Sequence, residues 1–158
     1  LHEKEADLDQ SLVDVISRAH SRGGKILIPA FSVGRTQNVV YHLHRLLGAK
    51  RIPPLPIFVD SPLSANATDV FRQHPECYDE DVLKFLERGI DPFGFGRLTY
   101  IREVEASKAL NDLASPCIII AASGMMESGR VLHHLKKIAP DPRGSMRLAA
   151  AWATRKPA

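Results

Sequence analysis

Hydrophobic positions recur at two different spacings along the chain, and the two spacings alternate. Within residues 8–19 apolar side chains return every three or four positions, which predicts a helix with one buried face. Residues 25–31, KILIPAF, form instead a short continuous apolar run, which is typical of a strand covered on both faces in a parallel sheet. A helical period returns over residues 32–47. The first third of the chain therefore predicts a helix, a strand and a second helix in direct succession.

The same alternation continues to about residue 143. Further apolar runs predict strands at residues 55–60, 98–101 and 117–123. Further helical periods predict helices at residues 61–74, 78–89, 103–115 and 128–139. Strands and helices that alternate at this spacing imply crossover connections and parallel pairing. The predicted fold class is therefore α/β: an open, mainly parallel sheet with helices on both faces, as in Rossmann-like domains.

Three predicted strand-to-helix turns combine hydroxyl, glycine and arginine residues. The first turn contains Ser32, Gly34 and Arg35, and the second contains Asp60, Ser61 and Ser64. The third contains Ser123, Gly124, Ser128, Gly129 and Arg130. In open parallel sheets ligands bind outside the carboxyl ends of the strands, where such turns meet. Helix N-termini offer unpaired amides, arginine offers a fork that matches two phosphate oxygens, and serine hydroxyls donate to the others. The three turns together predict a rim that binds phosphate.

Each turn taken alone has a simpler explanation. Ser, Asp and Gly are ordinary helix caps and turn residues, and this reading outweighs ligand binding for any single turn. Only the gathering of three such turns on one edge favours a site. None of them contains a P-loop, and no GxGxxG follows the first predicted strand. For Asp60, a role in stabilising its own turn is an equal alternative to a role in binding.

Composition and charge narrow the class of protein only slightly. The 158 residues are 44% hydrophobic and 25% charged, which is ordinary for a globular domain and argues against a disordered chain. A net charge of +3 permits a polyanionic partner without identifying one. No segment has the pattern of a signal peptide or a membrane span. With only two cysteines, Cys77 and Cys117, and no such segment, we expect reduced thiols and a cytoplasmic protein that contacts no membrane. Because neither cysteine belongs to a CxxC pair, we expect no structural zinc held by cysteines.

The histidines do not form a recognisable metal site. His42 and His44 lie two positions apart in one predicted helix, and His133 and His134 are adjacent in another, so neither pair shares a helix face. We expect them to be surface residues. No HxHxDH or HExxH motif occurs, and no paired acid and base stands out from the order of residues. The sequence predicts no bound metal and no catalytic residue in this chain alone.

Four longer segments resemble a known family. They are GGKILIPAFSVGRTQNVVYHL, PIFVDSPLSANATDVFRQHPECYD, DPFGFGRLTYIREVEASKALND and CIIIAASGMMESGRVLHHLKKIAPDPR. In this order they are similar to the β-CASP domain of metallo-β-lactamase-fold RNA-processing nucleases, including bacterial and archaeal relatives of the cleavage-factor endonuclease. We assign residues 1–143 to this β-CASP domain. Residues 144–158 form an atypical tail without a clear strand, similar to an out-of-frame or vector-derived sequence.

The resemblance implies a cap domain inserted into a metallo-β-lactamase fold, with RNA or another single-stranded nucleic acid in the cleft between the two parts. In that family two zinc ions, held chiefly by an HxHxDH motif of the lactamase-fold domain, supply the hydroxide that attacks a phosphodiester. Because this chain lacks that motif, we expect it to be inactive alone and its intact parent to be a zinc-dependent endo- or exoribonuclease. The resemblance implies backbone contacts at Ser32, Arg35, Ser61, Ser123, Gly124 and Arg130, and Asp60 as a weaker candidate that orients a neighbouring arginine or serine.

Two other functions fit the same residues. One is a self-contained α/β enzyme that acts on a small phosphorylated ligand, which the three turns would also hold. The other is a structural or docking cap, in which the turns are only packed loops. The expected protein partner is the missing lactamase-fold domain, and apolar surface left uncovered without it favours self-association. The phosphate-rim hypothesis requires Arg35 and Arg130 to lie on the same side of the molecule.

Overall fold

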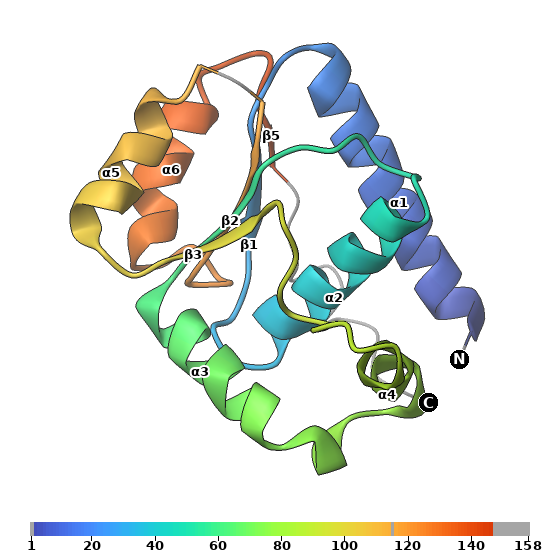
Figure 1. The fold of residues 1–158 in the computed structure, drawn as a ribbon. Coiled ribbons are helices and arrows are strands. Elements are labelled where there is room, and N and C mark those ends of the chain that lie inside the picture. Colours follow the sequence, from blue (N-terminus) through green and yellow to red (C-terminus); the bar gives the residue numbers. More distant parts are fainter. Residues whose placement is uncertain (1, 115, 147–158) are drawn as a thin grey trace.

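The structure, a computed structural model, describes residues 2–114 and 116–146 (Figure 1). Its strands are β1 (Ile26–Pro29), β2 (Ile57–Asp60), β3 (Leu98–Ile101), β4 (Ile118–Ala121) and β5 (Ser145–Met146). Its helices are α1 (His2–Ser21), α2 (Arg35–Gly48), α3 (Pro62–Gln73), the short 3-10 helix η1 (Pro75–Cys77), α4 (Glu80–Glu87), α5 (Val104–Asp112) and α6 (Arg130–Ile138). Within the described ranges, no helix has the length and apolar character needed to cross a membrane.

The strands of the described residues form one parallel sheet in the order β3-β2-β4-β1-β5. The central strand β4 pairs with β1 and β2, so that Ile26 and Ile57 both lie opposite Ile118. All four residues of β1 and of β4 are buried, as expected for strands that carry a continuous apolar run rather than an alternating one.

Helices cover both faces of the sheet. Figure 1 shows α5 and α6 on one side and α1 and α2 on the other. Because successive strand residues point to opposite faces, Ile28 and Ile120 pack with Leu12 of α1 in one core cluster. Ile119 packs with Val131 of α6 in a second cluster on the other face. The predicted fold class, an open α/β sheet with parallel strands and helices on both faces, is confirmed.

The helix starts at the carboxyl edge of the sheet are of two kinds. Ser61 caps α3, because its Oγ accepts a hydrogen bond from the Ser64 amide at 3.1 Å. α2 and α6 instead begin after Gly34 and Gly129, at φ 76° and 83°, and neither helix has a side-chain cap. A residue with a Cβ is strained at such φ values, so glycine sets both sharp entries. Each entry is followed at once by an arginine.

The expectation that residues after 143 contain no strand is wrong for Ser145 and Met146. They form β5, which pairs with Ile26 and Leu27 of β1 in parallel. Two residues are too few to show an alternating pattern in the sequence, so β5 can be recognised only from its pairing with β1 in the structure. Residues 147–158 lie outside the described part of the chain, and the domain boundary at residue 143 stays a prediction.

Candidate functional site at the carboxyl edge of the sheet

The strand order creates a crevice at the carboxyl edge of the sheet. β4 lies between β2 and β1. Helix α2 follows β1 and packs on the same face of the sheet as α1. Helix α6 follows β4 and packs on the opposite face (Figure 1). Chains that leave neighbouring parallel strands in opposite directions leave a crevice between them, the usual ligand position in open α/β sheets. The loops after β1, β2 and β4 meet at this point.

A pocket of about 360 Å³ occupies the crevice and is lined by all three loops. Its lining includes most of the residues predicted from the sequence: Ser32, Asp60, Ser61, Ser123 and Arg130.

Arg35 lies next to this pocket, in a wider hollow of about 430 Å³ that Phe31 and Gly34 also line. Gly124 packs against the same loop, because a Cβ there would come within 3.0 Å of the Phe31 amide nitrogen. The turns of Arg35 and Arg130 thus lie along one edge of the sheet, as the phosphate-rim hypothesis requires.

Two hydroxyls from different loops meet at the floor of the pocket. Ser32 Oγ lies 3.3 Å from Ser61 Oγ. Ser61 Oγ already accepts a hydrogen bond from the Ser64 amide, so its own proton is free to be donated to Ser32. With that donor arrangement the proton of Ser32, which is half-buried, is available to an anion in the pocket.

Asp60 lies beneath the rim rather than on it. Its side chain is fully buried, and its two carboxylate oxygens accept hydrogen bonds from three side chains. Arg130 Nη1 donates to Oδ1 at 2.7 Å, while Ser107 Oγ and His134 Nε2 lie 2.5 Å and 2.6 Å from Oδ2. Burial raises the pKa of Asp60, but the hydrogen bonds from His134, Ser107 and Arg130 outweigh it and hold the pKa below its usual value. The Asp60 carboxylate is therefore an internal anion, whose two oxygens are engaged by partners within the chain.

Arg130 is committed to this internal network. Besides its ion pair with Asp60, its Nη2 donates to the Arg102 carbonyl at 2.7 Å, and its side chain is only 18% exposed. The buried carboxylate of Asp60 balances its charge. Its N–H groups donate to the carbonyls of Ile101 and Arg102, and these bonds hold the β4–α6 loop against the end of β3. Arg130 lines the pocket, but its first role is to fix the loop.

Two histidines contradict the predicted surface positions. His134 is fully buried, with Nδ1 3.0 Å from Asn111 Oδ1 and Nε2 on Asp60, and His42 is 2% exposed with Nδ1 2.8 Å from Asp9 Oδ1. The spacing within each histidine pair says nothing of which single histidine is buried. Helical spacing from a single apolar neighbour, Val131 before His134, would have placed this side chain on the buried stripe of α6.

Arg35 differs from Arg130 in having no partner. It is half-buried at the first position of α2, and no hydrogen bond or ion pair joins its guanidinium to any part of the chain that the structure describes. The first turn of α2 contains no acidic residue. A cation at the positive end of a helix is unfavourable unless an anion joins it. Arg35 is therefore the rim residue best placed to bind an external anion.

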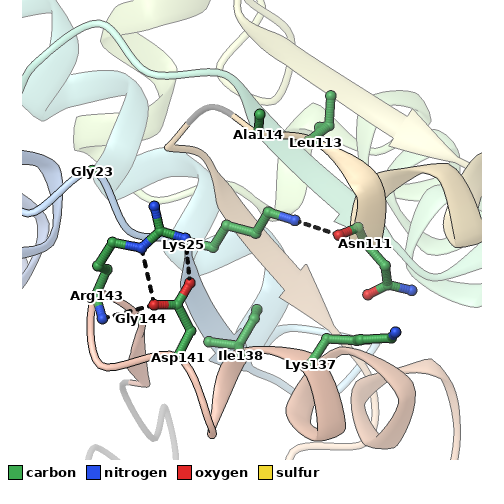
Figure 2. A pocket seen from close by; sticks show the side chains of 10 residues that line it. All are labelled: Gly23, Lys25, Asn111, Leu113, Ala114, Lys137, Ile138, Asp141, Arg143 and Gly144. Atoms are coloured by element: carbon green, nitrogen blue, oxygen red, sulfur yellow. Dashed lines mark hydrogen bonds and ion pairs between the residues drawn. The ribbon is translucent and has the colours of Figure 1, made fainter.

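A second basic hollow, of about 180 Å³, lies at the opposite, amino edge of the sheet (Figure 2). Two of its three basic side chains, those of Lys25 and Arg143, make contacts within the chain. Lys25 Nζ donates to the carbonyls of Leu110 and Asn111 at the end of α5, at 2.9 Å and 2.8 Å, and Arg143 pairs with Asp141 at 2.9 Å. The Lys25 contacts tie the end of α5 to the start of β1, so this side chain serves the fold.

No metal site is found among the described side chains, those of residues 9–114 and 116–145. Nowhere in these ranges do three or more His, Cys, Asp or Glu side chains come together in a way that would hold an ion. The described side chains do not fit a zinc pair.

The family whose profile matches the chain is described as the Beta-Casp domain, and the match covers residues 36–150. A ribonuclease of Thermus thermophilus, TTHA0252, is 35% identical over 137 residues, which are 87% of this chain and 31% of the relative. The transcription termination factor FttA of Methanosarcina mazei is 33% identical over 141 residues, 89% of this chain and 22% of the relative. An RNase J-like protein of Methanocaldococcus jannaschii is 30% identical over 146 residues, 92% of this chain and 32% of the relative. The chain thus spans about a third or less of the length of these relatives.

Proposed function

The chain belongs to the Beta-Casp domain family, and we propose that it is the nucleic-acid-contacting cap of a larger ribonuclease. In this proposal the carboxyl edge of the sheet holds the phosphate backbone of RNA and guides it into the cleft with the catalytic domain. Two relatives named as a ribonuclease and an RNase J-like protein support RNA as the ligand. Cleavage itself belongs to the whole protein, with any zinc held by residues outside those described here.

The observation that carries the proposal is the unpartnered guanidinium of Arg35 beside the uncapped start of α2. Phosphate would pair with this guanidinium while the Ser32 hydroxyl donates to another of its oxygens, and the positive end of the α2 dipole favours the anion. Such contacts do not depend on base sequence, which suits a surface that guides a strand. Arg130 and Asp60 act one layer deeper in this proposal, by holding the β4–α6 loop in place.

Exposed apolar side chains around the rim support docking of the missing catalytic domain. Phe31, Val33, Leu63 and Met125 are 45%, 58%, 59% and 58% exposed, and all lie in or beside the loops that follow β1, β2 and β4. Large apolar side chains gathered on one edge mark a surface that another protein covers. Without that domain, the same edge favours self-association of the chain.

Free thiols support a reducing, cytoplasmic location as part of the same proposal. Cys77 is exposed and Cys117 is buried, and neither forms a disulfide.

The test is binding of a fluorescent single-stranded RNA to the chain at several salt concentrations. We expect weak, salt-sensitive binding without cleavage. Arg35→Ala should lower the affinity roughly fivefold, equivalent to about 1 kcal/mol, and should reduce the slope of log affinity against log salt by about 0.7. Arg143→Ala is the matched control, since it removes the same charge at the opposite edge.

Three results would contradict the proposal. Equal affinities of the Arg35 and Arg143 variants would favour a docking cap, in which the turns are only packed loops. Tight binding of a nucleotide in a thermal-shift assay, without any effect of RNA, would favour an enzyme for small phosphorylated ligands. Robust zinc-dependent cleavage by this chain would show that it is not a non-catalytic cap.

A further inference from the structure

An aromatic pocket lies on the other side of the first turn of α2 from the Arg35 hollow. It has a volume of about 170 Å³, and the rings of Tyr41, Phe71, Tyr78 and Phe93 line it. Gly34 and Asn38 line both this pocket and the Arg35 hollow, so the two are neighbours. Pockets for complete small ligands usually measure about 300–1,000 Å³, so this one has room for a single ring system rather than a whole cofactor.

The walls of the aromatic pocket are held in place before any ligand arrives. Phe93 is 4% exposed and packs edge to face against Phe71 and Tyr78, with ring centroids 6.1 Å and 5.7 Å apart. The Tyr78 hydroxyl donates to the Phe71 carbonyl at 2.7 Å. Flat rings fixed in this way offer a planar guest stacking and edge contacts at little cost in side-chain entropy.

Asn38, His42 and Asp79 contribute polar side chains to the lining, and so does Gln37, whose carboxamide is buried in a residue that is 2% exposed. Its Nε2 donates to the carbonyls of Ser32 and Ser64 at 3.2 Å and 3.3 Å and to Thr68 Oγ1 at 2.9 Å. Thr68 Oγ1 already donates to the Ser64 carbonyl, so all three partners are acceptors and the orientation of the carboxamide is fixed.

Gln37 Oε1 therefore has to find its donor elsewhere. Among the side chains that the structure describes, in residues 9–114 and 116–145, it is the buried nitrogen or oxygen for which no hydrogen-bond partner is found. A buried acceptor without a donor carries a desolvation penalty, which a ligand N–H group would remove.

We propose that this pocket receives one nucleobase of the bound strand and that the exocyclic amine of the base donates to Gln37 Oε1. The inference rests on the proposed function, because the phosphates of the same strand would lie at Arg35. An acceptor without a donor in the lining of an aromatic pocket favours a planar ring that carries an N–H donor. The cap thus prefers a base with an exocyclic amine, which is adenine, cytosine or guanine, at one position of an otherwise sequence-independent path.

The first test compares oligonucleotides that differ only in that amine. Oligo(A) is set against an oligomer of purine riboside, and oligo(C) against an oligomer of pyrimidin-2-one riboside. We expect the amine to raise affinity about two- to tenfold in at least one of the two series, the range for one net hydrogen bond. Gln37→Leu should abolish that ratio, whereas Arg35→Ala should lower all affinities and leave the ratio unchanged.

The second test avoids any substitution that endangers folding. Cys77 is an exposed thiol in the lining of the aromatic pocket, so a bound base should slow its alkylation by iodoacetamide. Cys117 does not compete, because it is buried and burial raises the pKa of its thiol to about 11. We expect saturating oligo(A) or oligo(C) to protect Cys77 more than the oligomer without the amine.

The outcomes separate the two proposals. If RNA binds equally well with and without the exocyclic amine and does not protect Cys77, the base-pocket proposal is wrong, while the phosphate-rim proposal is unaffected. Failure of any RNA to bind overturns both.

Discussion

Replacement of Asp60 by asparagine should weaken the fold far more than its single-atom change suggests. Asp60 Oδ2 accepts hydrogen bonds from both Ser107 and His134. If the amide nitrogen of an asparagine took the place of Oδ2, it would face the two donors Ser107 and His134. In the other rotamer the amide nitrogen would face the Arg130 guanidinium. Breaking a buried ion pair by removing one partner costs about 3–5 kcal/mol. That loss is a large part of the roughly 5–15 kcal/mol that holds a typical domain folded.

The assay is urea unfolding of the wild-type chain and of Asp60→Asn, followed by circular dichroism. We expect the midpoint to fall with little change in slope, and the melting temperature to fall by about 6–20 °C for a domain of this size. Asp141→Asn is the control, because the Asp141–Arg143 pair is exposed and worth only about 0–1 kcal/mol. Equal effects of the two substitutions would refute the reasoning that the Asp60 network is a buried support of the loops.

The same network predicts how stability depends on pH. The pKa of Asp60 is lower in the folded chain than its unfolded value of about 3.9, so its contribution is fully present above that value. It is lost as pH falls through the lowered folded pKa. Unfolding measured between pH 6 and pH 3 should therefore show a steeper loss of stability in the wild type than in Asp60→Asn. Parallel curves would contradict the lowered pKa.

Three smaller changes test the rest of the fold. Gly24→Ala places a Cβ 1.7 Å from the Arg143 carbonyl oxygen, so β5 must move and thermal melting should show a loss of about 1–3 kcal/mol. Asp79→Ala removes the cap of the Val82 amide, and urea unfolding should show a loss of about 1 kcal/mol. Ile119→Val, in the fully buried middle of β4, should cost about 0.5–1.5 kcal/mol in the same assay, and no loss there would place β4 outside the core.

The strands and helices were largely readable from the sequence because their signals are local. The runs CIII and KILI are too apolar for strands on the surface. The segments between the strands repeat their apolar residues at helical spacing for long enough to be recognised as helices. β5 gave no such signal, since its two residues become a strand only through hydrogen bonds to β1, more than a hundred residues earlier.

The candidate site was readable in position but not in chemistry. Turns after parallel strands had to meet at one edge, so Ser32, Ser61 and Ser123 could be named in advance. The buried state of Asp60 could not, because it depends on His134, a residue 74 positions away whose identity had suggested a surface role. The unsatisfied oxygen of Gln37 could not be predicted from the sequence either. It depends on three acceptors that the fold brings together, one in the loop after β1 and two in α3.

The two rim arginines show how the fold assigns different roles to one local pattern. Arg35 and Arg130 both follow a glycine and both open a helix, so the sequence treats them alike. Strand order separates them: β4 lies beside β2, whose last residue is Asp60, and so Arg130 meets a carboxylate that Arg35 does not. Neutralising Asp60 should therefore release the charge of Arg130 to the rim. RNA affinity should rise in Asp60→Asn while stability falls, and a fall in both, measured where the variant is still folded, would show that Arg130 serves the fold alone.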